Sequence, residues 1–155
     1  MKVCLVCSHG GHLSEMLRLV NAFSKEEVTL VTYDELFTRT LRNSLISRKY
    51  LIEDLTLKLS KYRSRPILGS FILLIHMMVV CLKELKIFLK EKPSIIISTG
   101  SEIAIPICFL GKIFRKKVIF IESLCRVKEL SGTGRIVYRI SDIFLVQWPP
   151  LLSKY

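Results

Sequence analysis

Acidic residues are scarce in this chain relative to basic ones. Its 155 residues include 13 Asp and Glu against 24 Lys and Arg, which leaves a formal net charge of +11. Half of the residues are hydrophobic and only 24% are charged, a balance that excludes intrinsic disorder. The length fits one domain, 1–155, and excludes a large two-domain enzyme in a single polypeptide. A hydrophobic chain with this positive excess indicates an anionic partner: a membrane leaflet, a nucleic acid or a phosphorylated ligand.

Cysteine is sparse too, with five residues at irregular spacing, which favours a reducing compartment over a disulfide framework. Cys4 and Cys7 form a C-x-x-C motif within an apolar run. Residues three apart on a strand point to opposite faces, so we interpret both as core residues. The motif G-x-G-x-x-G and any cluster with metal-ligand spacing are absent, so the sequence predicts no metal and no cofactor. The start, Met1-Lys2-Val3, enters a strand directly and does not resemble a signal peptide.

Short apolar runs alternate with segments of helical periodicity along the chain. The apolar runs are continuous rather than alternating, which is typical of parallel strands covered by helices on both faces. This pattern predicts a Rossmann-like α/β domain, a doubly wound parallel sheet with strand order 3-2-1-4-5-6. The expected strands are 2–7, 28–33, 50–52, 94–98, 117–121 and 142–146, and the expected helices are 12–23, 35–43, 66–91, 102–114 and 134–141.

A glycine-containing loop follows the first expected strand. In doubly wound sheets, ligands bind outside the carboxyl ends of the strands, near the point where the strand order reverses. This loop runs from Ser8 through His9, Gly10 and Gly11 to His12. Glycines allow the backbone to approach a ligand closely, and the following helix offers free amides at the positive end of its dipole. His12 can donate to a phosphate or act as a base. A simple turn with a capping polar residue is the alternative, and the residues alone favour neither.

Two further loops are expected at the same rim. Ser98-Thr99-Gly100-Ser101-Glu102 follows the fourth strand, and its alternative interpretation is an ordinary turn with Ser101 as an N-cap. After the fifth strand, Glu122 can bind a sugar hydroxyl or a protein amide, and Arg126 can bind a phosphate. A salt bridge between Glu122 and Arg126 is the alternative there.

The expected helix 66–91 contains a long apolar segment. Residues 67–82 carry no formal charge, and these 16 residues span about 24 Å, short of the roughly 30 Å hydrocarbon core. A buried core helix and an interfacial helix both remain open. A full span is rejected because it would separate the two halves of one sheet. His76 on this helix is interpreted as a packed residue rather than a ligand-binding one.

Basic residues cluster beside this helix in the sequence. Each Lys or Arg near an anionic leaflet contributes on the order of 1 kcal/mol, so the combination indicates peripheral or shallow membrane attachment. A solvated face on a basic protein is the alternative. Nucleic acid is not expected as a partner, because no motif for it is present. One cluster comprises Arg48, Lys49, Lys58, Lys61, Arg63 and Arg65, and the other comprises Lys112, Arg115, Lys116 and Lys117.

Five short motifs follow one another along nearly the whole chain. They are Ser8-His9-Gly10-Gly11-His12, Ile96-Ile97-Ser98-Thr99-Gly100, Ile121-Glu122-Ser123 with Arg126-Val127, Ser131-x-Thr133-Gly134 with Tyr138, and Asp142 with Val146-Gln147-Trp148. This pattern resembles the PssD-type polysaccharide biosynthesis proteins. It is also similar to the membrane-anchoring subunit of the two-part N-acetylglucosaminyltransferase that makes dolichol-linked chitobiose. In one respect it departs from that subunit, which begins with a transmembrane helix, whereas this chain begins with a strand.

The resemblance implies a split glycosyltransferase of the GT-B fold, in which two Rossmann-like halves face each other across a cleft. This chain is expected to be the N-terminal half, which holds the acceptor and touches the membrane. A related single-chain transferase that forms lipid II has a glycine-rich loop matching Gly10-Gly11-His12, which makes His12 the candidate base or phosphate contact. The other candidate acceptor- or phosphate-binding residues are His9, Gly10, Gly11, Thr99, Gly100, Ser101, Glu122, Ser123 and Arg126.

The primary hypothesis is an acceptor-binding hexosyltransferase subunit of exopolysaccharide or capsular polysaccharide biosynthesis, on the cytoplasmic face of the cell membrane. Its expected acceptor is a polyprenyl-diphosphate-linked sugar. Its expected partner is a donor-binding subunit that holds a UDP-sugar in a heterodimer, without which the chain is inactive. A non-enzymatic scaffold that recruits a transferase to the membrane is the alternative, and a complete small nucleotide-binding enzyme is a third.

Overall fold

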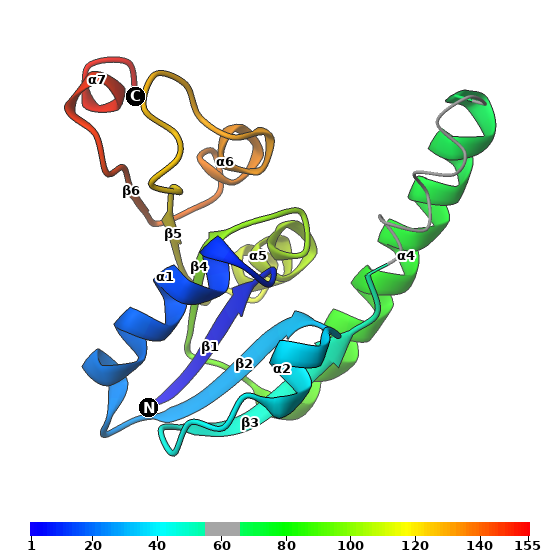
Figure 1. The fold of residues 1–155 in the computed structure, drawn as a ribbon, viewed down its shortest axis with the longest axis vertical. Coiled ribbons are helices and arrows are strands. Elements are labelled where there is room, and N and C mark those ends of the chain that lie inside the picture. The colour runs from blue at the N-terminus through cyan, green and yellow to red at the C-terminus, as the bar shows by residue number, and fades with distance from the viewer. Residues whose placement is uncertain (55–65) are drawn as a thin grey trace.

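The computed structural model describes residues 1–54 and 66–155, which build a six-stranded parallel sheet (Figure 1). The strand order is β3-β2-β1-β4-β5-β6, so the predicted Rossmann-like fold class and strand order are confirmed. Each central strand is an apolar, largely β-branched run that is buried on both faces, as parallel strands require. The strands are β1 (Lys2–Cys7), β2 (Glu27–Tyr33), β3 (Ile46–Ile52), β4 (Ile95–Gly100), β5 (Lys117–Ile121) and β6 (Ile143–Leu145).

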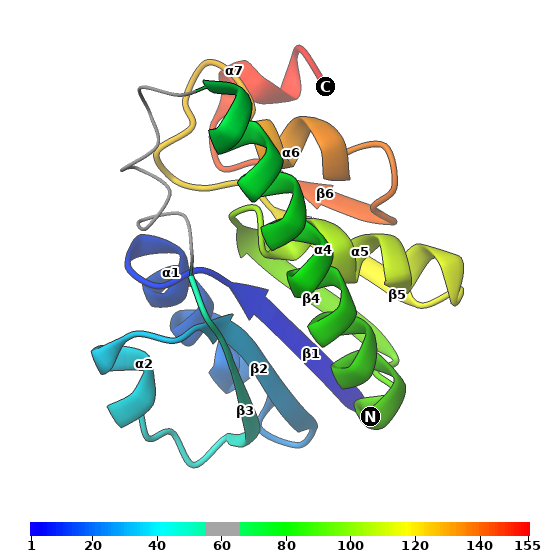
Figure 2. The same cartoon turned by 90° about the vertical axis from the view of Figure 1, so that its right-hand side faces the viewer.

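Helices connect the strands and cover both faces of the sheet. Helix α1 packs on one face, whereas α4 and α5 contact each other on the opposite face (Figure 2). Pro106 lies in the first turn of α5, where its missing amide breaks no helical hydrogen bond. The helical elements are α1 (Gly11–Leu19), η1 (Val20–Phe23), α2 (Leu36–Thr40), α4 (Pro66–Glu91), α5 (Ala104–Ile113), α6 (Gly132–Val137) and α7 (Pro149–Leu152).

The edge strand β3 begins four residues earlier than the predicted strand 50–52. Arg48 and Lys49 interrupt the apolar pattern there, yet both lie within the strand. An edge strand is half exposed, so polar side chains on it can form ion pairs instead of packing into a core. Arg48 Nη1 contacts the carboxylates of Glu27 (2.5 Å) and Glu91 (2.6 Å). These ion pairs stabilise Arg48 within the strand in place of apolar packing.

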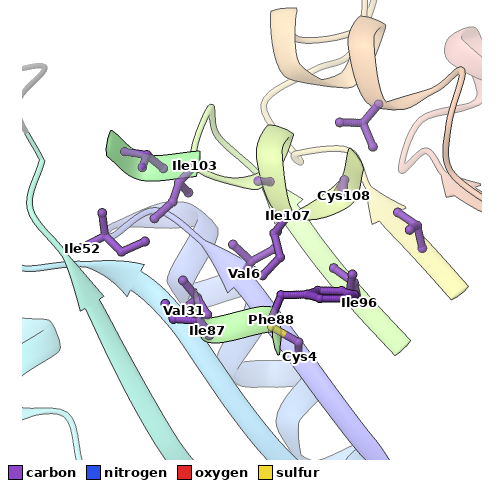
Figure 3. Close-up of a cluster of buried hydrophobic side chains, with 14 of the residues drawn as sticks. Cys4, Val6, Val31, Ile52, Ile87, Phe88, Ile96, Ile103, Ile107 and Cys108 are labelled. Carbon is purple, nitrogen blue, oxygen red and sulfur yellow. The ribbon is translucent and has the colours of Figure 1, made fainter. Parts of the chain in front are cut away.

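Two hydrophobic cores lie on opposite faces of the sheet. One core, between the sheet and helices α4 and α5, includes Cys4, Phe88 and Ile107 (Figure 3). The other packs against α1 and includes Cys7 and Leu13. The two cysteines therefore point to opposite faces, as their spacing predicts, and burial raises the pKa of Cys7 to about 12. Both remain protonated core residues rather than a redox pair.

Helix α4 has the predicted bounds, and apolar side chains lie on both of its faces. The face that packs on the domain includes the core residues Val80 and Phe88, together with His76 and Glu84, which are 1% and 0% exposed. The opposite face is uncovered, so α4 is not a fully buried core helix. Its first turns reach beyond the carboxyl ends of the strands (Figure 1). The C-terminal half of α4 also carries exposed lysines. The apolar residues that form the outer face of α4 are Phe71, Leu74, Ile75, Met78, Val79, Leu82 and Leu89.

The structure bears on the predictions about membrane crossing and about the first basic cluster. Within the ranges 1–54 and 66–155, no helix has both the length and the apolar character needed to cross a bilayer. Four residues of the first predicted basic cluster, Lys58, Lys61, Arg63 and Arg65, lie outside the described residues.

Candidate functional site

A cavity of about 510 Å³ opens at the carboxyl edge of the sheet, where the loops after β1, β4 and β5 converge. It lies at the predicted switch point, because β1 and β4 are neighbours whose following helices pack on opposite faces. Half of the predicted site residues line it. The lining residues are Gly11, His12, Glu15, Ser101, Glu102, Ser123, Cys125, Arg126, Ser131, Gly132 and Thr133.

Two reciprocal hydrogen bonds hold His12 against the end of β4. Nδ1 of His12 donates to the carbonyl oxygen of Thr99 (2.7 Å), and the Thr99 hydroxyl donates to the carbonyl oxygen of His12 (2.8 Å). A carbonyl oxygen can only accept, so Nδ1 carries the proton and the neutral ring keeps its lone pair on Nε2. Nε2 is therefore the nitrogen that can act on a ligand in the cavity, as a base or, once protonated, as a donor.

The imidazole ring of His12 lies close against Gly100. That residue has a φ of +118°, and a Cβ placed on it would lie 2.8 Å from Cε1 of His12. Ser101 follows with a φ of +79°, a left-handed conformation that costs a non-glycine residue on the order of 1 kcal/mol. Thr99 and Gly100 do not line the cavity themselves, and they act on it by orienting His12.

The glycine loop leaves the start of α1 open. Gly10 is the N-cap with a φ of +71°, and its carbonyl oxygen accepts a hydrogen bond from the Ser14 amide at 3.0 Å. The nine-residue helix has no side-chain cap and no acidic residue in its first turn. A Cβ on Gly11 would meet no atom within 4 Å. Uncapped amides at the positive end of a helix dipole suit a phosphate group.

Glu122 lies beneath the loop that follows β5. Its side chain is 0% exposed and accepts hydrogen bonds from the amides of Ser123 and Ser131, both at 2.9 Å. Gly134 leaves room for it, because a Cβ on that glycine would overlap the carboxylate. This geometry favours the protein-amide alternative for Glu122 over the sugar-hydroxyl one, and it ties the loop to the start of α6.

Arg126 and Ser123 bring the third loop to the cavity wall. The Arg126 amide donates to the carbonyl oxygen of Ser123 (2.9 Å), which closes a turn and leaves the arginine side chain exposed at the cavity. The alternative salt bridge to Glu122 is not formed, because that carboxylate binds backbone amides instead. The Arg126 guanidinium is thus available to an anion.

Glu15 is a cavity residue that the sequence interpretation missed. It lies three residues after His12 on α1, and this spacing, which puts both residues on one side of the helix, is the sequence signal that points to it. Its Oε1 accepts a hydrogen bond from the Leu124 amide (3.2 Å). Its Oε2 is buried and has no hydrogen-bond partner among the described residues. The Glu15 carboxylate lines the cavity, where a carboxylate can accept a hydrogen bond from a sugar hydroxyl.

A second missed carboxylate is Glu102. It accepts hydrogen bonds from the Tyr33 hydroxyl (2.9 Å) and from the Ser101 hydroxyl (2.7 Å). Burial raises the pKa of Tyr33, and the negative charge of Glu102 raises it further, so Tyr33 remains a donor. These two residues are 69 positions apart and meet because β2 and β4 end at the same edge. No local sequence signal predicts that contact.

His9 lies outside the cavity lining. Its ring centroid is 6.2 Å from that of Tyr33, and its Nδ1 is buried without a partner in the described part of the chain. In the same described part, no group of three or more His, Cys, Asp or Glu residues is arranged to hold a metal ion. The cavity thus combines a proton acceptor at His12, an anion-binding side at α1 and Arg126, and a hydroxyl acceptor at Glu15.

Comparison with known families yields a match over almost the whole chain. The family model described as "Oligosaccharide biosynthesis protein Alg14 like" matches residues 3–155. The Mus musculus protein named UDP-N-acetylglucosamine transferase subunit ALG14 is 33% identical over 172 residues, covering 100% of this chain and 79% of the mouse protein. The subunit of the same name from Schizosaccharomyces pombe is 30% identical over 162 residues, covering 94% of this chain and 75% of its own length.

Solved structures share the fold at low sequence identity. Acinetobacter baumannii MurG superposes with a TM-score of 0.72 at 14% identity, covering 96% of this chain and 42% of MurG. A putative UDP-N-acetylglucosamine 2-epimerase from Listeria monocytogenes superposes with a TM-score of 0.66 at 15% identity, covering 99% of this chain and 41% of the epimerase. The chain therefore spans about two fifths of the length of these proteins, and the likeness is one of Rossmann-like fold.

Proposed function

This chain belongs to the Alg14-like family of oligosaccharide biosynthesis proteins, and on that premise we propose that it is the acceptor-binding subunit of a split glycosyltransferase. Its mouse and fission yeast relatives are named subunits of a UDP-N-acetylglucosamine transferase, which supports a reaction shared between two polypeptides. This chain contributes one Rossmann-like domain, and a separate donor-binding subunit contributes the domain that binds a UDP-sugar. The cavity at the carboxyl edge of the sheet then faces the donor in a heterodimer.

The observation that carries this proposal is the hydrogen bond from His12 Nδ1 to the Thr99 carbonyl at 2.7 Å. It leaves the Nε2 lone pair to remove the proton from an acceptor hydroxyl. The hydroxyl oxygen then bonds to the anomeric carbon of the sugar, the bond from that carbon to the diphosphate breaks, and UDP leaves. His12 holds the proton until solvent removes it.

The acceptor is a polyprenyl-diphosphate-linked sugar. Its diphosphate binds the uncapped amides at the start of α1 and the exposed Arg126 guanidinium, which lie along one cavity. Its sugar hydroxyls donate to the carboxylate of Glu15, which lines the same cavity. The remaining predicted residues act indirectly: Thr99 and Gly100 orient His12, and Glu122 shapes the loop that carries Arg126. His9 and Ser101 stay predicted contacts.

The chain attaches to the cytoplasmic face of the cell membrane as a peripheral or shallowly inserted protein. The outer face of α4 supports this attachment, because its side chains are apolar, with Phe71 and Met78 each 60% exposed. An apolar helix face beside basic residues is the physical pattern of an interfacial helix. The first turns of α4 extend past the carboxyl edge, so the same membrane that holds the helix brings a lipid-linked acceptor to the cavity.

The product belongs to exopolysaccharide or capsular polysaccharide synthesis, as the resemblance to PssD-type proteins implies.

Reconstitution tests the proposal. Transfer from a labelled UDP-sugar to a polyprenyl-diphosphate-linked acceptor is measured with the chain alone, the donor-binding subunit alone, and both together. We expect transfer only from the mixture. In the mixture, His12→Ala should lower the rate by about 100-fold or more, the typical contribution of a general base. Ser14→Ala, an exposed change on the same helix, serves as the matched control and should leave the rate within about twofold.

Two outcomes would contradict the proposal in different ways. Full transfer by the isolated chain would refute the accessory role. A fully active complex that contains His12→Ala would leave only the alternative of a membrane scaffold, because recruitment does not need a base at that position.

A further inference from the structure

A second cavity, of about 450 Å³, lies at the opposite edge of the sheet, where α5 turns into β5. It is lined by four cations and one carboxylate. Lys112 Nζ contacts Asp142 Oδ1 at 2.9 Å, while Asp142 Oδ2 accepts a hydrogen bond from the Val118 amide at 2.8 Å, so both oxygens of this carboxylate already have partners. The other three cations, Arg115, Lys116 and Lys117, leave the cavity strongly positive.

The backbone presents one of these cations at a conformational cost. Helix α5 ends in a motif in which Lys116 N donates to Gly111 O (2.8 Å) and Arg115 N donates to Lys112 O (3.1 Å). Arg115 occupies the left-handed position of that motif with a φ of +53°, where glycine is the favoured residue. A strained non-glycine residue is a reason to look for a role for its side chain.

The favourable interaction of a cation with a helix C-terminus explains part of this cluster. It accounts for Lys112 and Arg115, which lie in or directly after the last turn of α5. It does not account for Lys116 and Lys117, which continue the charge into β5, or for a cavity of ligand size between them.

Exposed apolar side chains directly precede the last three cavity cations in the chain and form an apolar border. Ile113 is 70% exposed and Phe114 is 44% exposed. The Phe114 ring lies 5.1 Å from that of Phe88 in the C-terminal part of α4, and the next residue, Leu89, belongs to the outer face of that helix. Cations next to an uncovered apolar surface match a ligand that has an anionic head and a hydrocarbon tail.

We propose that the cavity formed by Arg115, Lys116 and Lys117 binds the phosphate of an anionic phospholipid whose acyl chains lie against Ile113, Phe114 and the outer face of α4. A free phosphate or a soluble nucleotide would leave the apolar border exposed to water, whereas a phospholipid covers it. This site rests on the membrane attachment proposed above, and it adds selectivity for anionic lipid at a position remote from the transfer site.

The experiment compares two double variants of the full chain that each remove two positive charges. Arg115→Gly/Lys116→Gln changes the cavity, and Arg18→Gln/Lys25→Gln changes exposed residues at and after the end of α1, on the other face of the sheet. Arg115→Gly places glycine at a left-handed position, so this variant should unfold at the same temperature as the wild type or higher. Binding is measured on neutral phosphatidylcholine vesicles and on vesicles that also contain phosphatidylglycerol.

We expect the cavity variant to lose about 30-fold in affinity for phosphatidylglycerol vesicles, in line with the summed contributions of two basic residues near an anionic surface. The control variant should stay within about twofold, and neither should change binding to neutral vesicles. Equal losses of affinity in both variants would overturn the proposed site, because binding would then depend on the net charge of the protein and not on this cavity. Wild-type affinity in the cavity variant would overturn it outright, while leaving membrane attachment intact.

Soluble probes distinguish a phospholipid from the other phosphate-containing ligands, free phosphate and nucleic acid. Short-chain phosphatidylglycerol should bind the wild type at least tenfold more tightly than inorganic phosphate does. Equal binding of the two would make free phosphate the ligand and overturn the proposal, as would a single-stranded oligonucleotide whose binding the cavity variant abolishes. If the wild type ignores both kinds of vesicle, the proposed membrane attachment fails, and sugar transfer in the reconstituted mixture is unaffected by that result.

Discussion

Helices α1 and α4 cover opposite faces of one sheet, yet they differ in what they leave uncovered. On α1, Met16 is 0% exposed and Arg18 is exposed, as in any amphipathic helix that borders water. On α4, Phe88 is 3% exposed and packs in the core, but Met78 on the outer face is 60% exposed. Apolar surface left in water forfeits about 25 cal/mol per Å² of possible stabilisation, so the arrangement of α4 is favourable only where something apolar covers it. The two faces of the sheet are therefore built for different surroundings.

The polar residues under α4 add to this contrast. Neither ring nitrogen of His76 and neither carboxylate oxygen of Glu84 has a hydrogen-bond partner among the described residues. Burial raises the pKa of Glu84 well above its ordinary value, which the nearby Ile107 backbone offsets only in part. The packed face of α4 therefore combines apolar core residues with two polar side chains that lack partners in the described part of the chain, whereas on α1 Leu13 and Met16 meet apolar neighbours.

The largest effect should come from placing the same charge on each helix. Met16→Asp buries an unpaired carboxylate under α1 and should cost at least about 4 kcal/mol, enough to unfold much of the protein. Met78→Asp on the outer face of α4 should change the free energy of unfolding by less than about 0.5 kcal/mol. Denaturant unfolding measures both, and vesicle binding by the folded Met78→Asp variant should fall below that of the wild type. Similar destabilisation by the two variants would show that the outer face of α4 is packed in solution.

The next effect concerns the reactivity of thiols. Cys81 on α4 and Cys125 at the cavity are exposed, whereas Cys4, Cys7 and Cys108 are buried. Burial raises the pKa of Cys7 to about 12. Two of the five thiols should therefore react with a maleimide at least about 100-fold faster than the rest. Bound vesicles should protect Cys81 and leave Cys125 reactive; protection of neither thiol would contradict membrane contact through α4.

The smallest effect is a pH dependence that belongs to the packed face of α4. Unfolded, Glu84 titrates near its ordinary pKa of about 4.3; folded, it holds its proton to higher pH. The folded state therefore binds more protons above that value, and stability falls as the pH rises. Glu84→Leu should stabilise the protein by about 1–3 kcal/mol at pH 8 and by less at pH 4.

Thermal and urea unfolding across this pH range measure the effect of Glu84→Leu. The exposed Glu129, which pairs with Arg135 at 2.8 Å, provides the control substitution Glu129→Leu, for which we expect no such pH dependence. A gain from Glu84→Leu that does not change with pH would mean that Glu84 is charged in the folded state.

Several elements were predictable because local chemistry is enough to define them. The strands 2–7 and 117–121 and the helix 66–91 have their predicted bounds, since continuous apolar runs and Pro93 mark them without reference to the rest of the chain. The start of β3 was missed because Arg48 and Lys49 are stabilised by ion pairs and hydrogen bonds with distant residues. Tertiary partners of this kind leave no periodic signal in the sequence.

The candidate site divides in the same way. Its location followed from strand order, because parallel strands bring the loops after β1, β4 and β5 to one edge. The roles of single side chains did not follow. The Glu122 side chain lies beneath its loop and accepts hydrogen bonds from the amides of Ser123 and Ser131. Glu15 and Glu102 entered the cavity through contacts with segments far away in the chain.

The sequence by itself determined the alternation of strands and helices, the order of the strands and the positive charge of this protein. These depend on residue type and on spacing along the chain, both of which can be read locally. Only the tertiary structure decided which nitrogen of His12 is free, which carboxylates reach the cavity and which side of α4 is uncovered. A hydrogen-bond partner or a packed face exists only after distant segments meet. When apolar residues lie on all sides of a helix, their pattern does not predict which side the sheet will cover.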